Sequence, residues 1–186
     1  MIWLSRVDDP QRPVQTGQVD VVETVRLVVE DASHDDGVHL TDRPVSSAAP
    51  SGRVLLLDAP DEPVWVRGTE SELVLVWCNL VANALKYTED TGHVSVRVEK
   101  GPGTVEVVVT DDGIGIAPEE TDEIFKDFYR SPSPAARLRS GTGLGLGIVR
   151  RIVARHNGHI TVEALASQPT VFRVALPRCE GPQVVG

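Results

Sequence analysis

The chain has 186 residues, 41% of them hydrophobic, and two cysteines, Cys78 and Cys179, which suits one globular core in a reduced, cytosolic compartment. Its formal net charge is −9 and no basic cluster interrupts it, so a nucleic-acid backbone is not an expected partner. The densest apolar run, LVLVWCNLVANAL, is shorter than a membrane span and carries two asparagines, which argues against direct membrane contact.

The predicted elements begin with a helix within VDVVETVRLVVEDA, residues 19–32. Asp20 and Glu23 form an N-cap pattern at its start. Two short strands are expected next, GVHL and RVLLLD, with a connection rich in Pro, Ser and Ala between them. A second helix is predicted to open at Thr69, with Glu72 three residues later completing a second N-cap pattern.

Two strands, HVSVRVE and TVEVVVTD, should then pair around the turn KGPG. A polar segment over 113–140 precedes a third helix, which Gly158 is placed to end as a left-handed cap. The strands HITVEA and VFRVALP complete the pattern. This order predicts an α+β fold, a two-layer sandwich with helices packed on one face of a mixed, mostly antiparallel sheet.

The second helix carries two stripes of different character. At 100° per residue, one stripe is apolar and should be buried: Leu73, Trp77, Leu80 and Ala84. A polar stripe lies about 120° away: Asn79, Asn83, Lys86 and Tyr87. A solvated face is the simpler interpretation, but an Asn carbonyl oxygen suits Mg²⁺ and a Lys one turn later can meet phosphate.

The stretch TDDGIGIAPEE follows a strand and places Asp111 near the strand's C-terminal end. Gly113 and Gly115 permit a sharp turn and the close approach of a ligand. An ordinary Asp-Gly turn is one interpretation. The other is a carboxylate at the floor of an apolar pocket, where it can accept a hydrogen bond from an exocyclic amine and so select adenine.

The stretch SGTGLGLGIV, residues 140–149, has four glycines at the entrance of the third helix. They match neither the G-x-G-x-x-G dinucleotide motif nor the Walker phosphate loop. A glycine stretch feeding a helix N-terminus favours an anion, although a plain linker is the alternative. We expect the helix to begin near 144–146, and the preceding glycines to be coil without ligand.

In this order and spacing, NLVANALKYT, DDGIGI and GTGLGL resemble the histidine-kinase branch of the Bergerat-fold ATPases, whose relatives include DNA gyrase and the mismatch-repair ATPases. The resemblance covers the chain from about residue 16 to residue 178. It implies the catalytic and ATP-binding domain of a sensor histidine kinase in a two-component system, with ATP and Mg²⁺ as cofactors.

The resemblance also implies roles for individual residues. Asn79 and Asn83 match the two asparagines of the family's N box, with Asn83 as the Mg²⁺ ligand. Lys86 matches a phosphate-contacting lysine, Tyr87 the ring that packs against adenine, and Asp111 the aspartate that reads the adenine amine. The implied catalytic residues are Asn79, Asn83 and Lys86. The implied nucleotide-binding residues are Asn79, Asn83, Lys86, Tyr87, Asp111, Gly113, Gly115, Ile116, Phe128, Arg130, Gly141, Thr142, Gly143, Leu144, Gly145 and Leu146.

A nucleotide lid over residues 115–141 is implied as well. IFKDFYR, with Phe125, Phe128 and Arg130, resembles the phenylalanine box at the edge of this lid. The hydrolysing ATPases of the superfamily carry a glutamate where Asn79 stands, and an amide cannot replace that base. The resemblance therefore implies phosphoryl transfer to a protein, in which an acceptor imidazole attacks the γ-phosphorus in line.

The acceptor histidine of the family lies in an upstream helical hairpin, before an Arg and a Pro. His39 in HLTDRP has a superficial likeness but falls in a predicted strand. The remaining histidines are expected in loop, strand-edge or structural positions: His34, His93, His156 and His159. We therefore expect the acceptor on a separate histidine-containing phosphotransfer or dimerisation partner, with a response regulator downstream.

Residues 1–15 look like the end of the hairpin and its linker, 16–180 like the ATP-binding domain, and 181–186 like a tail. An excised part of a membrane-bound kinase and one half of a split kinase both fit this division. An anti-sigma-type serine kinase and a nucleotide-binding pseudokinase are the alternatives. Ser140, Gly147 and the stretch SQPTVFRV depart from the family pattern, whereas the phenylalanine box and the KYT ending favour the histidine kinase.

Overall fold

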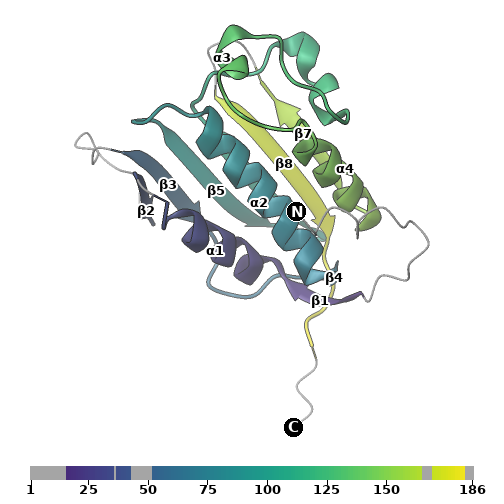
Figure 1. The fold of residues 1–186 in the computed structure, drawn as a ribbon. Coiled ribbons are helices and arrows are strands. Elements are labelled where there is room, and N and C mark those ends of the chain that lie inside the picture. Colours follow the sequence, from purple (N-terminus) through teal and green to yellow (C-terminus); the bar gives the residue numbers. More distant parts are fainter. Residues whose placement is uncertain (1–15, 36, 43–51, 165–168, 183–186) are drawn as a thin grey trace.

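The structure, a computed structural model, describes residues 16–35, 37–42, 52–164 and 169–182 (Figure 1). Segment 1–15 and most of the Pro-, Ser- and Ala-rich connection lie outside the described residues. The strands are β1 Gly17–Asp20, β2 Val38–Thr41, β3 Arg53–Asp58, β4 Trp65–Gly68, β5 His93–Lys100, β6 Thr104–Asp111, β7 His159–Glu163 and β8 Thr170–Pro177. The helices are α1 Val21–Ala32, α2 Glu70–Tyr87, α3 Pro134–Arg137 and α4 Gly145–Arg155, with 3₁₀ turns η2 Pro118–Glu120 and η3 Glu123–Phe125.

Six strands form one mixed sheet in the order β2-β3-β5-β6-β8-β7. The pairs β2–β3 and β3–β5 are parallel, and the other three pairs are antiparallel. Helices α1, α2 and α4 cover one face of this sheet (Figure 1). The predicted two-layer α+β sandwich is therefore confirmed. Strands β1 and β4, which pair antiparallel in a separate small sheet, were not predicted.

The core lies between α2 and the sheet. The predicted apolar stripe of α2 is buried, with Leu73, Trp77, Leu80 and Ala84 at most 3% exposed. They pack against the inward valines of β5 and β6, which alternate with outward polar residues. Because one face of α2 is fixed against the sheet, its polar stripe is held in one orientation.

The predicted caps of three helices can be compared with the structure. Asp20 caps α1 as predicted, because its Oδ1 accepts from the backbone N–H of Val22 at 3.0 Å. At α2 the second N-cap pattern does not form a side-chain bond: Thr69 precedes the helix, but its hydroxyl makes no cap contact. The left-handed residue after α4 is Asn157, with φ 56°, and not Gly158.

The end of α4 has the bonding of a Schellman motif. The N–H of Gly158 donates to the carbonyl of Val153 and the N–H of Asn157 to that of Ala154, both at 3.0 Å. A Cβ at position 158 would meet the Leu176 side chain at 2.6 Å, so the glycine is needed for close packing on β8. At its other end α4 begins at Gly145, within the predicted range of 144–146.

Within the described parts of the chain, no helix is both long and apolar enough to cross a membrane.

Candidate functional site

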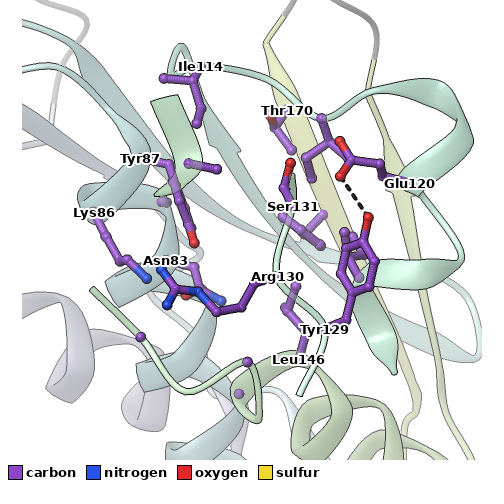
Figure 2. A pocket seen from close by; sticks show the side chains of 18 of the residues that line it. Asn83, Lys86, Tyr87, Ile114, Glu120, Tyr129, Arg130, Ser131, Leu146 and Thr170 are labelled. Atoms are coloured by element: carbon purple, nitrogen blue, oxygen red, sulfur yellow. Dashed lines mark hydrogen bonds between the residues drawn. The ribbon is translucent and has the colours of Figure 1, made fainter. Parts of the chain in front are cut away.

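The polar stripe of α2 forms one wall of a pocket at the N-terminal end of α4. Asn79 lines it together with Asn83, Lys86 and Tyr87, and the last three are labelled in Figure 2. The Asn79 side-chain N–H₂ donates to the carbonyl of Leu75 at 2.7 Å, so this amide is held by its own helix. Asn83 makes no side-chain hydrogen bond to any described residue, which leaves its amide oxygen available to a ligand.

Asp111 forms the buried side of the pocket at the C-terminal end of β6. Its side chain is enclosed, with the residue 4% exposed, and its Oδ1 accepts from the backbone N–H of Gly113 at 3.1 Å. Burial raises the pKa of this carboxyl to about 6; the bond from Gly113 lowers it and the neighbouring charge of Asp112 raises it. Ile114 and Ile116 lie close by in the same lining, so the carboxyl faces a partly apolar space.

The opposite side of the pocket is cationic. Lys86 and Arg130 reach into the same region as Asn83 in Figure 2, and neither forms an ion pair with a carboxylate of the described residues. Arg130 is held by a bond from its Nη2 to the carbonyl of Arg139 at 2.7 Å. The lysine ammonium lies 4.6 Å from the centroid of the Tyr87 ring. Two unpaired cations in one pocket favour an anionic ligand.

The glycine stretch borders this cationic side. Gly141, Thr142, Gly143, Gly145 and Leu146 line the pocket at the start of α4. A Cβ at position 145 would meet Asn79 Oδ1 at 2.5 Å, so that glycine lets α4 approach α2 closely. Gly143 has φ +75°, a backbone conformation that favours glycine, and a Cβ there would also meet the carbonyl of Tyr129 at 2.6 Å. These glycines therefore permit close approach between α2, α4 and the segment over 115–141.

Several lining residues were missed by sequence reasoning. Tyr129 donates its hydroxyl to Glu120 Oε1 at 2.7 Å, and this bond raises the pKa of Tyr129 to about 12 (Figure 2). Glu120 is itself 8% exposed. The segment over 115–141 also contributes Ile124, Ser131 and Ala136 to the lining, and β8 contributes Thr170 and Phe172. The chain brings these residues to the pocket only through tertiary packing. The one local sequence signal was the FYR run, which contains Tyr129 beside the predicted Arg130.

Three predicted residues do not line the pocket. Gly113 lies behind Asp111, where a Cβ would collide with the carbonyl of Tyr87. Phe128 is 73% exposed and adopts φ 63°, a strained conformation for a bulky side chain. Leu144 packs against the hydrophobic core at the start of α4. Gly113 and Leu144 support the pocket from behind, whereas Phe128 faces solvent.

The pocket thus combines a buried carboxyl and apolar side chains with a cationic, glycine-bordered side. A carboxylate can accept from an exocyclic amine, and free cations with backbone N–H groups can hold phosphates. No cluster of three or more His, Cys, Asp or Glu side chains that could hold a metal ion occurs among the residues described. A divalent ion here would rely on an Asn oxygen and the ligand's own phosphates.

Comparison with known proteins agrees with this arrangement. Residues 68–180 match the family described as histidine kinase-, DNA gyrase B- and HSP90-like ATPase. The sensor-like histidine kinase SenX3 of Mycolicibacterium smegmatis is 32% identical over 183 residues, which cover 98% of this chain and 44% of the relative. The sensor histidine kinase TrcS of Mycobacterium tuberculosis is 36% identical over 185 residues, covering 97% and 33% respectively.

A solved structure, the mycobacterial sensor histidine kinase MprB, superposes with a TM-score of 0.70 at 28% identity, covering 88% of this chain and 97% of that one. The chain spans less than half the length of the two curated relatives given above. Since the family match includes α2, β6 and the glycine stretch, and both the relatives and the solved neighbour are histidine kinases, the chain belongs to the histidine kinase-, DNA gyrase B- and HSP90-like ATPase family and has the fold of a histidine kinase catalytic domain.

Proposed function

We propose that the chain binds Mg-ATP in this pocket and transfers the γ-phosphoryl group to a histidine outside the chain. It acts as the cytoplasmic catalytic part of a two-component histidine kinase, with a histidine-containing partner and a response regulator downstream. The observation that carries the proposal is the polarity of the pocket. One pocket is lined by a buried carboxyl, Asp111, and by two unpaired cations, Lys86 and Arg130, together with the glycines before α4.

The adenine is assigned to the side formed by Asp111. In its ionised form this carboxylate accepts a hydrogen bond from the exocyclic amine. Ile116 and the Tyr87 ring supply apolar surface for the base. An adenine there leaves the phosphates directed toward Lys86 and the glycine stretch.

The phosphates are assigned to the cationic side. Asn83 would hold Mg²⁺ through its free amide oxygen, and a bound ion there would neutralise phosphate charge. Lys86 and Arg130 hold the phosphate oxygens. Asn79 lines the same region but has an amide in place of a carboxylate, so it cannot take a proton from water near neutral pH. This supports transfer to a protein over hydrolysis.

The acceptor is proposed to belong to a partner because no histidine among the described residues lines the pocket. His93 bonds to Asp112, with Nδ1 3.0 Å from Oδ2. His156 is 7% exposed at the far end of α4. His159 is exposed at the start of β7. None of these three imidazoles is placed for in-line attack on a phosphate beside Lys86.

Residues 115–141 are proposed to act as a lid that orders around ATP and releases ADP. The first part of this segment is anchored to the domain, because Asp127 pairs with Arg151 of α4 at 2.8 Å and Phe125 is buried edge-on against Phe172 of β8. Arg139 bonds to Glu89 at 3.2 Å near the end of α2, while the bonds of Tyr129 and Arg130 stay within the segment. The part after Asp127, which is held mainly by its own bonds, can therefore move without disturbing the core.

Direct binding of an ATP analogue tests the pocket assignment. Asn83→Ala and Asp111→Asn should each weaken Mg-dependent binding, measured by calorimetry, by about tenfold or more. Ser71→Ala, at an exposed position of α2, and Asp58→Asn, at the exposed end of β3, are matched controls and should bind normally. Unchanged affinity in both pocket variants would overturn the assignment.

Phosphoryl transfer is tested by mixing the chain and radiolabelled ATP with its cognate hairpin protein. The expected product is acid-labile, base-stable phosphate on that partner. Label on the histidines of this chain would contradict the proposal of an outside acceptor. Tight ATP binding without transfer would favour a pseudokinase, and acid-stable label on a partner serine would favour the serine-kinase alternative.

A further inference from the structure

A second cavity lies at the opposite end of α4 from the nucleotide pocket. It is lined by Thr16, Arg67, Arg155, His156, Asn157, Pro177 and Arg178. These residues come from the position before β1, from β4, and from the ends of α4 and β8 with the residues just after them. In Figure 1 these elements meet at the end of the molecule away from α3 and the lid. No part of the proposed function uses this cavity.

The cavity gathers positive charge in an acidic protein. Three of its lining residues are arginines and none is a carboxylate, although the whole chain carries a net charge of −9. Arg155 is balanced by Glu72, with Nη1 and Oε1 3.1 Å apart. The other two arginines form no ion pair with any residue that the structure describes.

The two unpaired arginines differ in how they are held. Arg67 is exposed on β4 and its guanidinium has no partner in the described part of the chain. Arg178 is anchored by a bond from Nη1 to the carbonyl of Gly101 at 2.7 Å. Its Nε is buried and makes no hydrogen bond to any described residue. Beyond the bond to Gly101, the guanidinium therefore keeps N–H donors that no described residue accepts from.

Among the described residues, no other unpaired charged side chain lines the cavity, although the negative end of the α4 dipole lies on this side. His156 Nε2 accepts from the backbone N–H of Thr69 at 3.1 Å and Nδ1 lies 2.8 Å from the carbonyl of Ile152, so both ring nitrogens are engaged. The last carbonyls of α4 point toward this end, but those of Val153 and Ala154 already accept bonds from the Schellman motif. The free charge in the cavity is therefore that of Arg67 and Arg178.

We propose that this cavity is an oxyanion-binding site that takes a phosphate or carboxylate group. Guanidinium groups present planar pairs of N–H donors that match the oxygens of these anions. Two sources have this chemistry. One is a free phosphate-like anion, and the other is the carboxylates of Asp8 and Asp9, which stand in the sequence segment that leads to Thr16 on the cavity wall.

An NMR titration of the full chain with sodium phosphate, at constant ionic strength, tests the site. Saturable shifts are expected at the backbone amides of 66–68 and 155–158. Arg67→Gln should weaken phosphate binding about tenfold, since it removes one charged donor group and no structural contact. Arg178→Lys keeps the positive charge but loses the planar pair of N–H donors, so it should also weaken phosphate binding. Normal ATP-analogue affinity shows that each variant is folded.

Two control variants separate this site from other surfaces. Arg97→Gln removes a surface arginine outside the cavity, and Lys86→Gln removes the nucleotide-pocket cation; both should leave the phosphate affinity at these amides unchanged. Absence of saturable shifts at 155–158, or equal affinity in Arg67→Gln and the native chain, overturns the proposal.

The source is decided by the double variant Asp8→Asn, Asp9→Asn. Tighter phosphate binding in this variant shows that the chain's own carboxylates compete for the site. An unchanged affinity, with the Arg67 effect retained, assigns the site to a free anion.

Discussion

If Asp111 reads the adenine as proposed, its carboxyl links nucleotide binding to pH. Burial raises the pKa of this carboxyl to about 6. Once protonated, the neutral carboxyl is a weaker hydrogen-bond acceptor for the adenine amine than the carboxylate is. ATP-analogue affinity should therefore fall below pH 6, by up to about tenfold per pH unit. The measurement is the dissociation constant between pH 5 and pH 8. Asp111→Asn should bind weakly with a flat profile over this range; a similar decline in that variant would assign the effect to another group.

The same residue should affect the stability of the nucleotide-free protein in the opposite direction. A carboxyl whose folded pKa lies above its unfolded value of 3.8 favours folding when protonated. Its favourable contribution is complete below 3.8 and is lost as pH rises through about 6. Urea unfolding should therefore show Asp111→Asn gaining stability relative to the native chain between pH 4 and pH 7.5. A constant difference over this range would contradict the assignment.

Thr24 and Trp77 give a residue-scale test of how α1 is fixed to α2. The buried Trp77 Nε1–H donates to Thr24 Oγ1 at 3.1 Å, and Thr24 is 3% exposed. Thr24→Val keeps the shape but leaves the indole N–H without an acceptor, which should cost about 1–3 kcal/mol in the free energy of unfolding. Leu27→Ala, on the same helix but 55% exposed, is the matched control and should change it by about 0.5 kcal/mol or less.

At the scale of elements, the glycines before α4 should not be equivalent. A Cβ at position 141 would meet only the flexible end of Lys86, whereas one at 143 would meet the lid backbone and require a positive φ. Gly143→Ala should therefore weaken ATP-analogue binding more than Gly141→Ala does. Both variants should keep a near-native unfolding midpoint, measured calorimetrically, because the core between α2 and the sheet is untouched. Equal binding losses would show that the lid backbone tolerates the added carbon.

Among the helices and strands, some features could be predicted from the sequence and others could not. The polar stripe of α2 was predictable because helical geometry alone places Asn79, Asn83 and Lys86 on one side once the apolar side is buried. The start of α4 was predictable because glycines disfavour helix. The small sheet of β1 and β4 was missed, since each strand has four residues and its partner lies far away in the sequence.

The pocket-lining residues of the proposed lid were missed for a different reason. Glu120 and Tyr129 meet through turns that carry no periodic pattern, so only the folded chain shows that their hydrogen bond faces the pocket. The end of α4 was placed one residue too late because both Asn and Gly can adopt a left-handed conformation. Asn157 takes that conformation, while the glycine at 158 serves close packing against β8.

At the scale of the whole molecule, the proposed nucleotide pocket joins α2, β6, β8, the proposed lid and α4. A ligand that contacts all of these binds only the folded chain, so it should raise the stability of the entire domain. At a concentration of 100 times its dissociation constant, an ATP analogue should stabilise the fold by about 2.7 kcal/mol. For a chain of this size, that corresponds to an increase of about 5–10 °C in the unfolding midpoint.

Removal of divalent ions should separate the roles of metal and fold. Because no metal-binding cluster of His, Cys, Asp or Glu occurs among the described residues, EDTA should leave the unfolding midpoint of the nucleotide-free protein unchanged. With the ATP analogue present, EDTA should remove most of the thermal shift, since in the proposed site Asn83 would hold a divalent ion that neutralises phosphate charge. Asn83→Ala should show a small shift with or without Mg²⁺. An EDTA effect on the nucleotide-free protein would instead indicate a structural metal that the proposed site does not include.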